Sequence, residues 1–287
     1  MKHTLLYSAL LSIGIMSACE LKTDKPPLMG GNITSEIGLN DAADGENAAH
    51  DVQRKEPDAT AVGIELPALR PQSGEQILHR EGYTASYNSE TRIPNWVAWH
   101  LTAGHTEGSY GRKGIKFAED EDVPEPRATD ADYYCSGYDR GHMCPSADNK
   151  WSEKAQLQSF LFTNACPQMH SLNAGDWNEM EQQCRKWAKR YGDIYIVSGP
   201  ILYKGRHKTI GHNKVVVPEA FFKVVLCMKD EPKAIGFIYK NMEGNRPKDA
   251  YVNTVDEVER ITGYDFFPAL PDETENRVEA SADLKQW

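Results

Sequence analysis

The sequence predicts an α+β fold, because strand-like and helix-like stretches are mixed over roughly its last two hundred residues. Short runs rich in β-branched and aromatic residues, bounded by turn formers, predict strands at 96–101, 194–198, 215–217, 221–227 and 234–239. Longer stretches with helical spacing predict helices at 153–163, 174–191 and 255–262. No internal repeat and no second long apolar segment accompanies them, so the pattern indicates one folded domain.

The first eighteen residues have the pattern of an export signal. Lys2 precedes an apolar run over 5–16, which is short for a membrane-spanning helix. The run ends in Met16-Ser17-Ala18-Cys19, which resembles the lipobox of bacterial lipoproteins. We therefore expect residues 1–18 to be a lipoprotein signal peptide and Cys19 to be lipidated, with a plain secretory signal as the alternative. Both predict an exported protein, and the first predicts a membrane anchor.

Composition divides the remaining chain into three parts. Residues 19–75 are rich in Asp, Glu, Pro, Gly and Asn without hydrophobic periodicity, and we expect a flexible acidic linker there. Residues 76–270 hold the predicted elements, and we expect 271–287 to be an acidic C-terminal tail. The formal net charge is −10, but residues 71–270 carry only −3 of it. The folded part is therefore near neutral, and its net charge does not exclude a polyanionic ligand.

Apart from Cys19, the chain has an odd number of cysteines. In an exported protein disulfides are plausible, but the sequence does not fix their pairing. A zinc site built from four of the nearby side chains is an alternative that lacks any Cys-x-x-Cys spacing. The residues concerned are Cys135, His142, Cys144 and Cys166, with Cys184 and Cys227 outside that group.

The helix predicted at 174–191 contains no proline and stops before Gly192, which places Asn173 at its N-cap. Trp177, Glu181 and Arg185 recur every four residues and so share one face. A surface ion pair between Glu181 and Arg185 is the simplest reading of that spacing. The helix at 255–262 begins behind Thr254, with a glutamate three residues later as in a capping box.

The run Asp139-Arg140-Gly141-His142 concentrates chemistry in four residues. Histidine ionises near neutral pH and so can remove a proton from water, and arginine is suited to holding a phosphate. Together they suggest phosphodiester hydrolysis. An ordinary salt-bridged turn is the alternative reading of this short motif.

Several further motifs occur in order after this run, and together they resemble one known family. They include Trp96–Thr102, Asn164-x-x-Pro167-Gln168, Asn173 with Trp177 and Glu181, and the stretch 262–268. Over about 96–268 the chain resembles the DNA/RNA non-specific endonucleases of the ββα-metal class, which include the endonuclease G type. The resemblance implies a ββα-metal nuclease fold with a central antiparallel sheet flanked by helices.

The resemblance also implies roles for individual residues. His142 matches the general base, Asn173 the metal-binding asparagine, and Glu181 the acidic residue that orients the water around the metal. Asn164, Arg140 and Arg185 match residues that line the same site. Arg112 matches the phosphate-binding arginine, although Arg92 and Arg127 compete for that place. The implied ion is Mg²⁺, with Mn²⁺ as the alternative, and no organic cofactor is implied.

These expectations combine into a metal-dependent, sequence-non-specific endonuclease of DNA and RNA that leaves 5′-phosphate ends. The protein would be anchored by lipid on the periplasmic or surface side of a bacterial membrane, and a homodimer is left open. One rival is a surface lipoprotein of the same fold that binds nucleic acid without cutting it. A second is a hydrolase with Cys144 as nucleophile and His142 as its base.

Overall fold

The computed structural model describes residues 63–68, 72–242 and 244–287. The predicted signal peptide, Cys19 and most of the predicted linker lie outside the described residues. The first strand, β1, begins at Glu75, one residue before the start expected for the domain.

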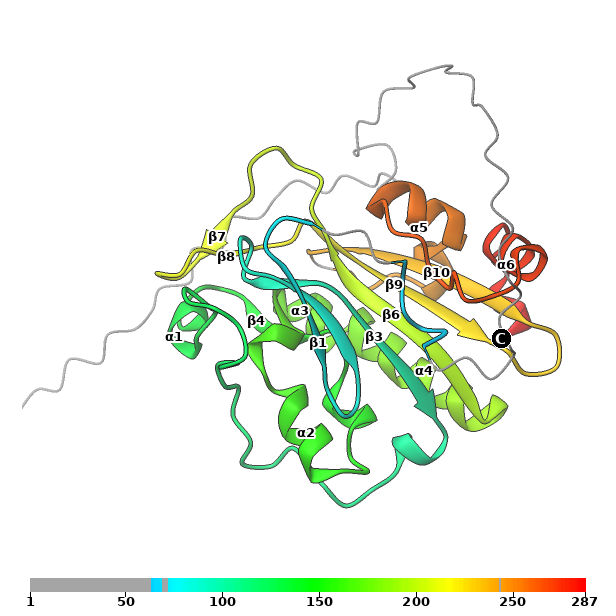
Figure 1. Ribbon diagram of the computed structural model, residues 1–287, viewed down its shortest axis with the longest axis horizontal. Helices are drawn as coiled ribbons and strands as arrows, with labels where there is room; N and C mark the ends of the chain where they lie inside the picture. Colours follow the sequence, from blue (N-terminus) through cyan, green and yellow to red (C-terminus); the bar gives the residue numbers. More distant parts are fainter. Residues whose placement is uncertain (1–62, 69–71, 243) are drawn as a thin grey trace, which may run out of the picture.

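A seven-stranded sheet forms the centre of the molecule, with the order β1-β2-β3-β6-β9-β10-β11 (Figure 1). Every pair of neighbouring strands in it is antiparallel. Its strands are β1 (Glu75–His79), β2 (Thr84–Asn88), β3 (Ile93–Thr102), β6 (Asp193–Ile201), β9 (Ala220–Cys227), β10 (Lys233–Lys240) and β11 (Val252–Asn253). The expected central antiparallel sheet flanked by helices is confirmed.

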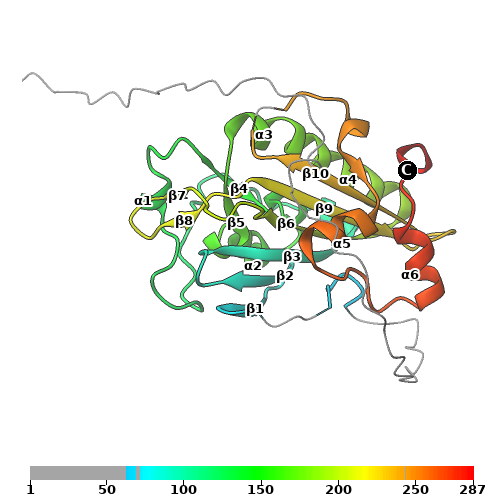
Figure 2. The ribbon, with the colours of Figure 1, turned by 90° about the horizontal axis from the view of Figure 1, so that it is seen from above.

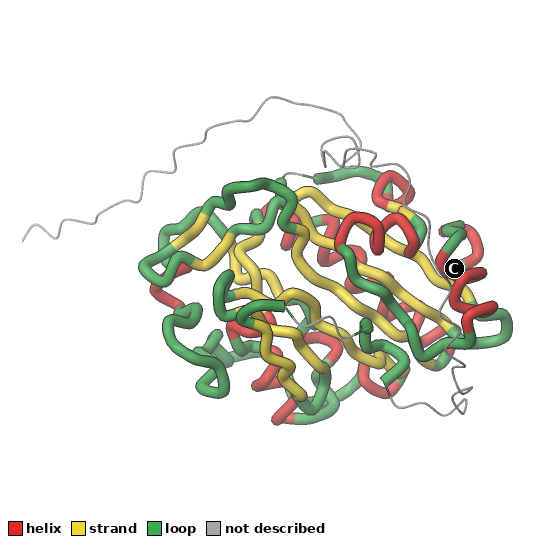
Figure 3. The backbone as a smooth tube through the Cα atoms, turned by 45° about the horizontal axis from the view of Figure 1, so that its top comes forward, coloured by secondary structure: helices red, strands yellow, loops and turns green. Residues whose placement is uncertain are grey.

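Two smaller antiparallel ribbons lie outside this sheet. The first pairs β4 (Asp139–His142) with β5 (Ala165–Gln168), and the second pairs β7 (Thr209–Ile210) with β8 (Val215–Val216). Figure 3 shows the strands as a band between helices, with long loops at the end that carries β7 and β8. The sequence correctly predicted the strands that became β3, β6, β8, β9 and β10, each to within three residues.

The helices are short except for one. They are α1 (Asp130–Tyr133), α2 (Glu153–Ser159), α3 (His170–Ala174), α4 (Asp176–Tyr191), α5 (Val255–Thr262) and α6 (Asp272–Glu279). The α5 prediction is confirmed, including its cap, because the Thr254 hydroxyl accepts a hydrogen bond from the backbone N–H of Glu257 at 3.1 Å. The predicted helix at 153–163 ends earlier, at Ser159, and a 3₁₀ turn follows over Phe162–Asn164.

Side chains from the two faces of the sheet build two separate cores. On β3, Val97 and Trp99 face the core beneath α4, whereas Trp96 and Ala98 face the core beneath α5 and α6. This alternation follows from the two-residue period of a strand. Figure 2 shows α4 and α5 on opposite sides of the strands.

The stretch 271–287, expected to be an acidic tail, is instead folded onto the domain. It contains α6, whose Val278 is buried in the second core, and ends at Trp287, which is 7% exposed. The Trp287 ring packs on Trp187 of α4 at 4.6 Å between centroids. Because α6 is rich in acidic residues, the sequence did not indicate that Val278 and Trp287 are buried. Among the described residues, no helix is long and apolar enough to cross a bilayer.

Candidate active site

A β-ribbon followed by two helices carries most of the residues singled out by the sequence. His142 ends β4, β5 pairs beside it, and α3 and α4 follow directly in the chain. The side chain of Gln168 on β5 lies against the backbone of Gly141. A Cβ at Gly141 would stand 2.3 Å from the Gln168 side-chain oxygen. Only glycine fits there. The loop beyond His142 is tied to the sheet, because the Ser198 hydroxyl donates to the Met143 carbonyl at 3.1 Å.

The His142 ring lies between two aromatic rings. Phe117 is 4.8 Å from it and Phe160 4.9 Å, between ring centroids. Its Nε2 atom is buried and has no hydrogen-bond partner among the described residues. Burial, with a smaller contribution from the Arg112 charge, lowers the pKa of His142 to about 3. The imidazole is therefore neutral at physiological pH, which is the form a general base requires.

Of the three competing arginines, the structure brings Arg112 to this histidine. Its guanidinium carbon lies 5.7 Å from the centre of the Phe160 ring, and its charge acts on both His142 and Glu181. Arg92 instead donates to the carbonyl of Glu90 in the turn before β3. Arg127 pairs with Glu119 at 3.0 Å. Arg112 is exposed, so its charge is available to a ligand.

The sequence predicts that Asn173 caps α4, but in the structure it does not. It lies inside α3, and Gly175 separates α3 from α4. A Cβ at Gly175 would come within 2.4 Å of the Ser171 carbonyl oxygen, so the break needs a glycine. The absence of proline suggested one continuous helix, but the steric demand at Gly175 overrides that pattern.

The Asn173 side chain is oriented by a carboxylate from β4. Its Nδ2 donates to Asp139 Oδ2 at 2.8 Å, and Nδ1 of His170 lies 2.8 Å from the same oxygen. The amide oxygen of Asn173 accepts no hydrogen bond from the described residues. One end of the amide is thus fixed, and the acceptor end stays available.

Glu181 lies on α4 above a buried charged cluster. Arg185, four residues on, does not form the predicted surface pair with it but donates to Asp148 Oδ1 at 2.8 Å. Burial raises the pKa of Glu181 to about 7, and the positive charge of Lys223 is the strongest opposing influence. Glu181 has no hydrogen-bond or ion-pair partner in the described part of the chain, so its oxygens are available to a ligand.

Lys223 of β9 is fully buried beneath α4. Its ammonium nitrogen lies 4.3 Å from the centre of a Trp177 ring and 5.0 Å from that of Trp99. These cation–π contacts offset part of the cost of burying the charge. The sequence did not indicate Lys223, because a single lysine in an apolar strand gives no sign of what it faces. Nor did the sequence indicate that Asp139 orients Asn173, although Asp139 belongs to the Asp-Arg-Gly-His run.

The donor set at this site suits a hard divalent cation. The Asn173 amide oxygen and the Glu181 carboxylate are oxygen ligands, and neither is used by another described residue. Magnesium is bound in proteins by few such oxygens and keeps much of its water. The residues present therefore fit the ion that the sequence resemblance implies.

Arg140 has partners of its own. It pairs with Asp130 of α1 at 2.7 Å, and its guanidinium carbon lies 5.3 Å from the centre of the Tyr133 ring. Because residues two apart on a strand face the same side, Arg140 shares the side of β4 that carries His142. Asp130 is 70% exposed, so this pair is open to exchange with an incoming anion.

Asn164 is fully buried and its amide is completely used. It accepts from the Cys144 backbone N–H at 2.9 Å and donates to the carbonyls of Cys144 and Ser159, each at 2.8 Å. It therefore cannot contact a substrate. We correct its expected place in the reaction to that of a positioning residue, which holds the loop behind His142.

The five cysteines in the described part of the chain are all unpaired, so no disulfide forms among them. Cys144 is buried, and its sulfur accepts a hydrogen bond from Asn149 Nδ2 at 3.3 Å. Burial raises the pKa of the Cys144 thiol well above its usual range. A neutral, enclosed thiol is a poor nucleophile and a poor zinc ligand, which argues against both alternatives that used it.

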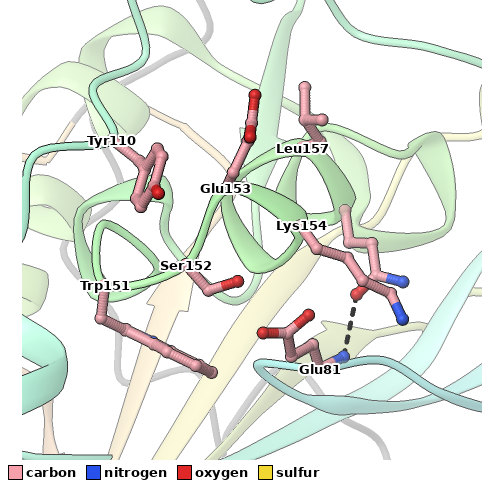
Figure 4. Close-up of a pocket in the computed structure, with 8 residues that line it drawn as sticks. Glu81, Tyr110, Trp151, Ser152, Glu153, Lys154 and Leu157 are labelled. Atoms are coloured by element: carbon pink, nitrogen blue, oxygen red, sulfur yellow. Dashed lines mark hydrogen bonds between the residues drawn. The ribbon is translucent and has the colours of Figure 1, made fainter.

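An open surface hollow of about 680 Å³ lies beside α2 (Figure 4). None of the predicted site residues lines it. At its edge Glu81 and Glu153 are both exposed, which disfavours a polyanion. The lining residues are Glu81, Tyr110, Trp151, Ser152, Glu153, Lys154, Leu157 and Gln158.

Comparison with known proteins identifies relatives over the same region. The family model for DNA/RNA non-specific endonuclease matches residues 67–273. The chain is 36% identical over 216 residues to the mitochondrial nuclease EXOG of Danio rerio, covering 70% of this chain and 63% of that protein. It thus spans less than two thirds of that relative's length.

Two further similarities support the match. Mitochondrial endonuclease G of Homo sapiens is 31% identical over 209 residues, covering 68% of this chain and 70% of that protein. A crystal structure of an EndoG/EndoGI complex, described as showing the mechanism of EndoG inhibition, aligns with a TM-score of 0.66 and 27% identity. That alignment covers 69% of this chain and 88% of the other.

Proposed function

This chain belongs to the DNA/RNA non-specific endonuclease family, and we propose that it is a metal-dependent endonuclease that hydrolyses DNA and RNA without sequence preference. The observation that carries the proposal is the meeting of three groups: the neutral His142, the exposed cation of Arg112, and the unpartnered carboxylate of Glu181. A base, a phosphate-binding cation and a metal ligand are what phosphodiester hydrolysis requires.

His142 is the proposed general base. It removes a proton from water as the water oxygen attacks phosphorus, and the bond from phosphorus to the 3′ oxygen breaks. The 3′ oxygen leaves with a proton from solvent, which gives a 3′-hydroxyl and a 5′-phosphate. An arriving phosphate offsets the Arg112 charge beside the imidazole, so substrate binding itself raises the basicity of His142.

Arg112 and Arg140 are the proposed phosphate-binding side chains, and Arg185 holds Asp148 beneath Glu181. Asn173 and Glu181 would hold the metal, with Asp139 orienting the asparagine. When bound, Mg²⁺ would withdraw charge from the phosphate oxygens. Contacts to the backbone of the polymer, rather than to base edges, account for the absence of sequence preference.

The test uses supercoiled plasmid and a structured RNA with the purified chain, in Mg²⁺ and in excess chelator. Cleavage of both polymers in Mg²⁺, abolished by chelator, supports the proposal. Ends that ligase joins directly support attack by water, and 3′-phosphate ends contradict the assigned leaving group. Plasmid that is retarded in a gel but never cut would favour the alternative of a binding protein.

We further propose that the protein is an exported lipoprotein anchored through Cys19, on the pattern Met16-Ser17-Ala18-Cys19. Radiolabelled fatty acid should enter the wild-type precursor and not the Cys19→Ser variant. Unlabelled wild-type protein released in soluble form would favour a plain secretory signal instead.

A further inference from the structure

Three carboxylates from α5 and α6 meet on the face of the sheet opposite α4. One oxygen each from Asp256, Glu259 and Glu279 lies within 4.8 Å of the other two. In Figure 1 the two helices that carry them lie side by side at the end of the molecule away from β4. The sheet and its two cores stand between this cluster and His142.

Glu279 distinguishes this cluster from an ordinary acidic surface. It is only 5% exposed, and its Oε1 atom is buried with no hydrogen-bond partner among the described residues. A buried carboxylate oxygen without a donor is costly, and natural structures rarely leave one. Because an oxygen of this side chain lies within 4.8 Å of oxygens of Asp256 and Glu259, a cation shared by the three side chains would supply a partner.

The charged groups that act most strongly on Glu279 are all negative. Burial raises the pKa of Glu279 to about 9, and the four charged groups that add to the effect are Glu259, Glu275, Asp256 and Asp265. Burial also raises the pKa of Glu259 to about 7. One oxygen of Glu259 accepts the backbone N–H of Phe266 at 2.7 Å, which fixes its carboxylate while leaving the second oxygen available.

We propose that Asp256, Glu259 and Glu279 bind one calcium ion that ties α6 to α5. The ligands are all carboxylate oxygens, which favours a hard cation over zinc or copper. Three protein carboxylates gathered at one place suit calcium, which takes six to eight oxygen ligands in a flexible geometry. Magnesium usually keeps several waters and is bound through only one or two carboxylates.

The site is structural and separate from the proposed catalytic metal. Its ligands come from two helices that cover the second core, so bound calcium should stabilise the fold without entering the reaction. Extracellular sites of this kind have dissociation constants of roughly 10⁻⁴ to 10⁻³ M. Calcium at about 10 mM should then raise the unfolding temperature by a few degrees.

The experiment compares variants of the full chain after chelator treatment. Unfolding temperature and the number of calcium ions bound are measured with and without 10 mM calcium, roughly ten to a hundred times the expected dissociation constant. Glu279→Gln and Asp256→Asn remove ligands, and Asp256 is exposed, so that variant should fold. Glu273→Gln is the matched control, because it removes one exposed charge from the same helix.

Wild type, Glu273→Gln and Asn173→Ala should each gain the temperature shift, whereas Asp256→Asn and Glu279→Gln should lose it and bind one ion fewer. Asn173→Ala keeps the result independent of the proposed nuclease metal. A full shift in Glu279→Gln, or none in wild type, would overturn the site. A larger shift with magnesium than with calcium, lost in Glu279→Gln, would overturn the choice of ion.

Discussion

Asp139 on β4 accepts a hydrogen bond from Asn173 on α3 at 2.8 Å, so the ribbon that carries His142 also orients the side chain offered to the metal. The asparagine alone could turn either end of its amide toward the site. The carboxylate fixes the nitrogen end, which leaves the oxygen as the ligand. Asp139, three positions before the proposed base, thereby links the strand that carries His142 to the proposed metal ligand Asn173.

Asp139→Ala should therefore weaken Mg²⁺ binding without abolishing cleavage. Because partners that orient a metal ligand commonly matter by roughly tenfold to a hundredfold, we expect the Mg²⁺ concentration for half-maximal cleavage to rise by that factor. Glu179→Ala on the exposed side of α4 is the control and should behave as wild type. An unchanged Mg²⁺ requirement in Asp139→Ala would remove the positioning role.

Replacing His142 by alanine should lower turnover by roughly a hundredfold to ten-thousandfold while DNA affinity changes little, because the base acts in the chemical step. Plasmid cleavage and gel retardation measure the two quantities. His79→Ala, at an exposed position on β1, controls for loss of a histidine. If His142→Ala keeps wild-type turnover, the general base is not His142, and His170, which contacts Asp139, becomes the candidate.

The pKa of about 3 at His142 makes a prediction that differs from an ordinary histidine near 6.5. In an NMR titration from pH 8 to pH 5, the His142 ring signals should stay constant. The pH dependence of the free energy of unfolding follows from this pKa shift. Between these two pKa values the unfolded chain binds a proton at His142, whereas the folded chain does not. Stability should thus fall on acidification below 6.5.

His142→Asn should lessen that acid sensitivity. Relative to wild type, we expect a gain on the order of 1 kcal/mol at pH 5 that vanishes at pH 8, measured by urea unfolding at each pH. A His142 signal that titrates with a midpoint near 6.5 would show that the buried environment does not persist in solution.

Asn164→Ala should act on stability first. It leaves three buried backbone groups without partners, and each costs about 1 to 3 kcal/mol, so a loss of several kcal/mol is expected in urea unfolding. Asn276→Ala, which removes one exposed bond on α6, should cost much less. If Asn164→Ala loses activity but keeps wild-type stability, Asn164 takes a direct part in the reaction.

The sequence predicted the apolar strands and the capped helix well, because β3, β9 and α5 carry strong periodic patterns. It missed β1 and β2, whose residues are largely polar or small and pair at the edge of the sheet. It also did not predict β4. Asp139, Arg140 and His142 are polar because the site needs them, and those residues conceal the strand on which they lie.

The sequence named the candidate site residues one by one, but it did not predict the contacts among them. Nothing in the spacing shows that Arg185 turns to Asp148, or that Lys223 lies under α4, since those partners are distant in sequence. The break at Gly175 depends on the backbone conformation there, which brings the Cβ position within 2.4 Å of the Ser171 carbonyl oxygen four residues earlier. Local patterns identify which chemistry is present, and packing decides which groups meet.

The two cores on either side of the sheet also bear on how such a protein can change over evolutionary time. Adjacent residues of β3 face different cores, so a substitution at Ala98 alters packing under α5, while one at Val97 alters packing under α4. Substitutions in the two cores that lie far apart and share no contact contribute additively to stability. Stability can therefore be adjusted through the core under α5 while the face that carries the proposed active site stays unchanged, so the protein can adapt to a new temperature or medium without altering that site.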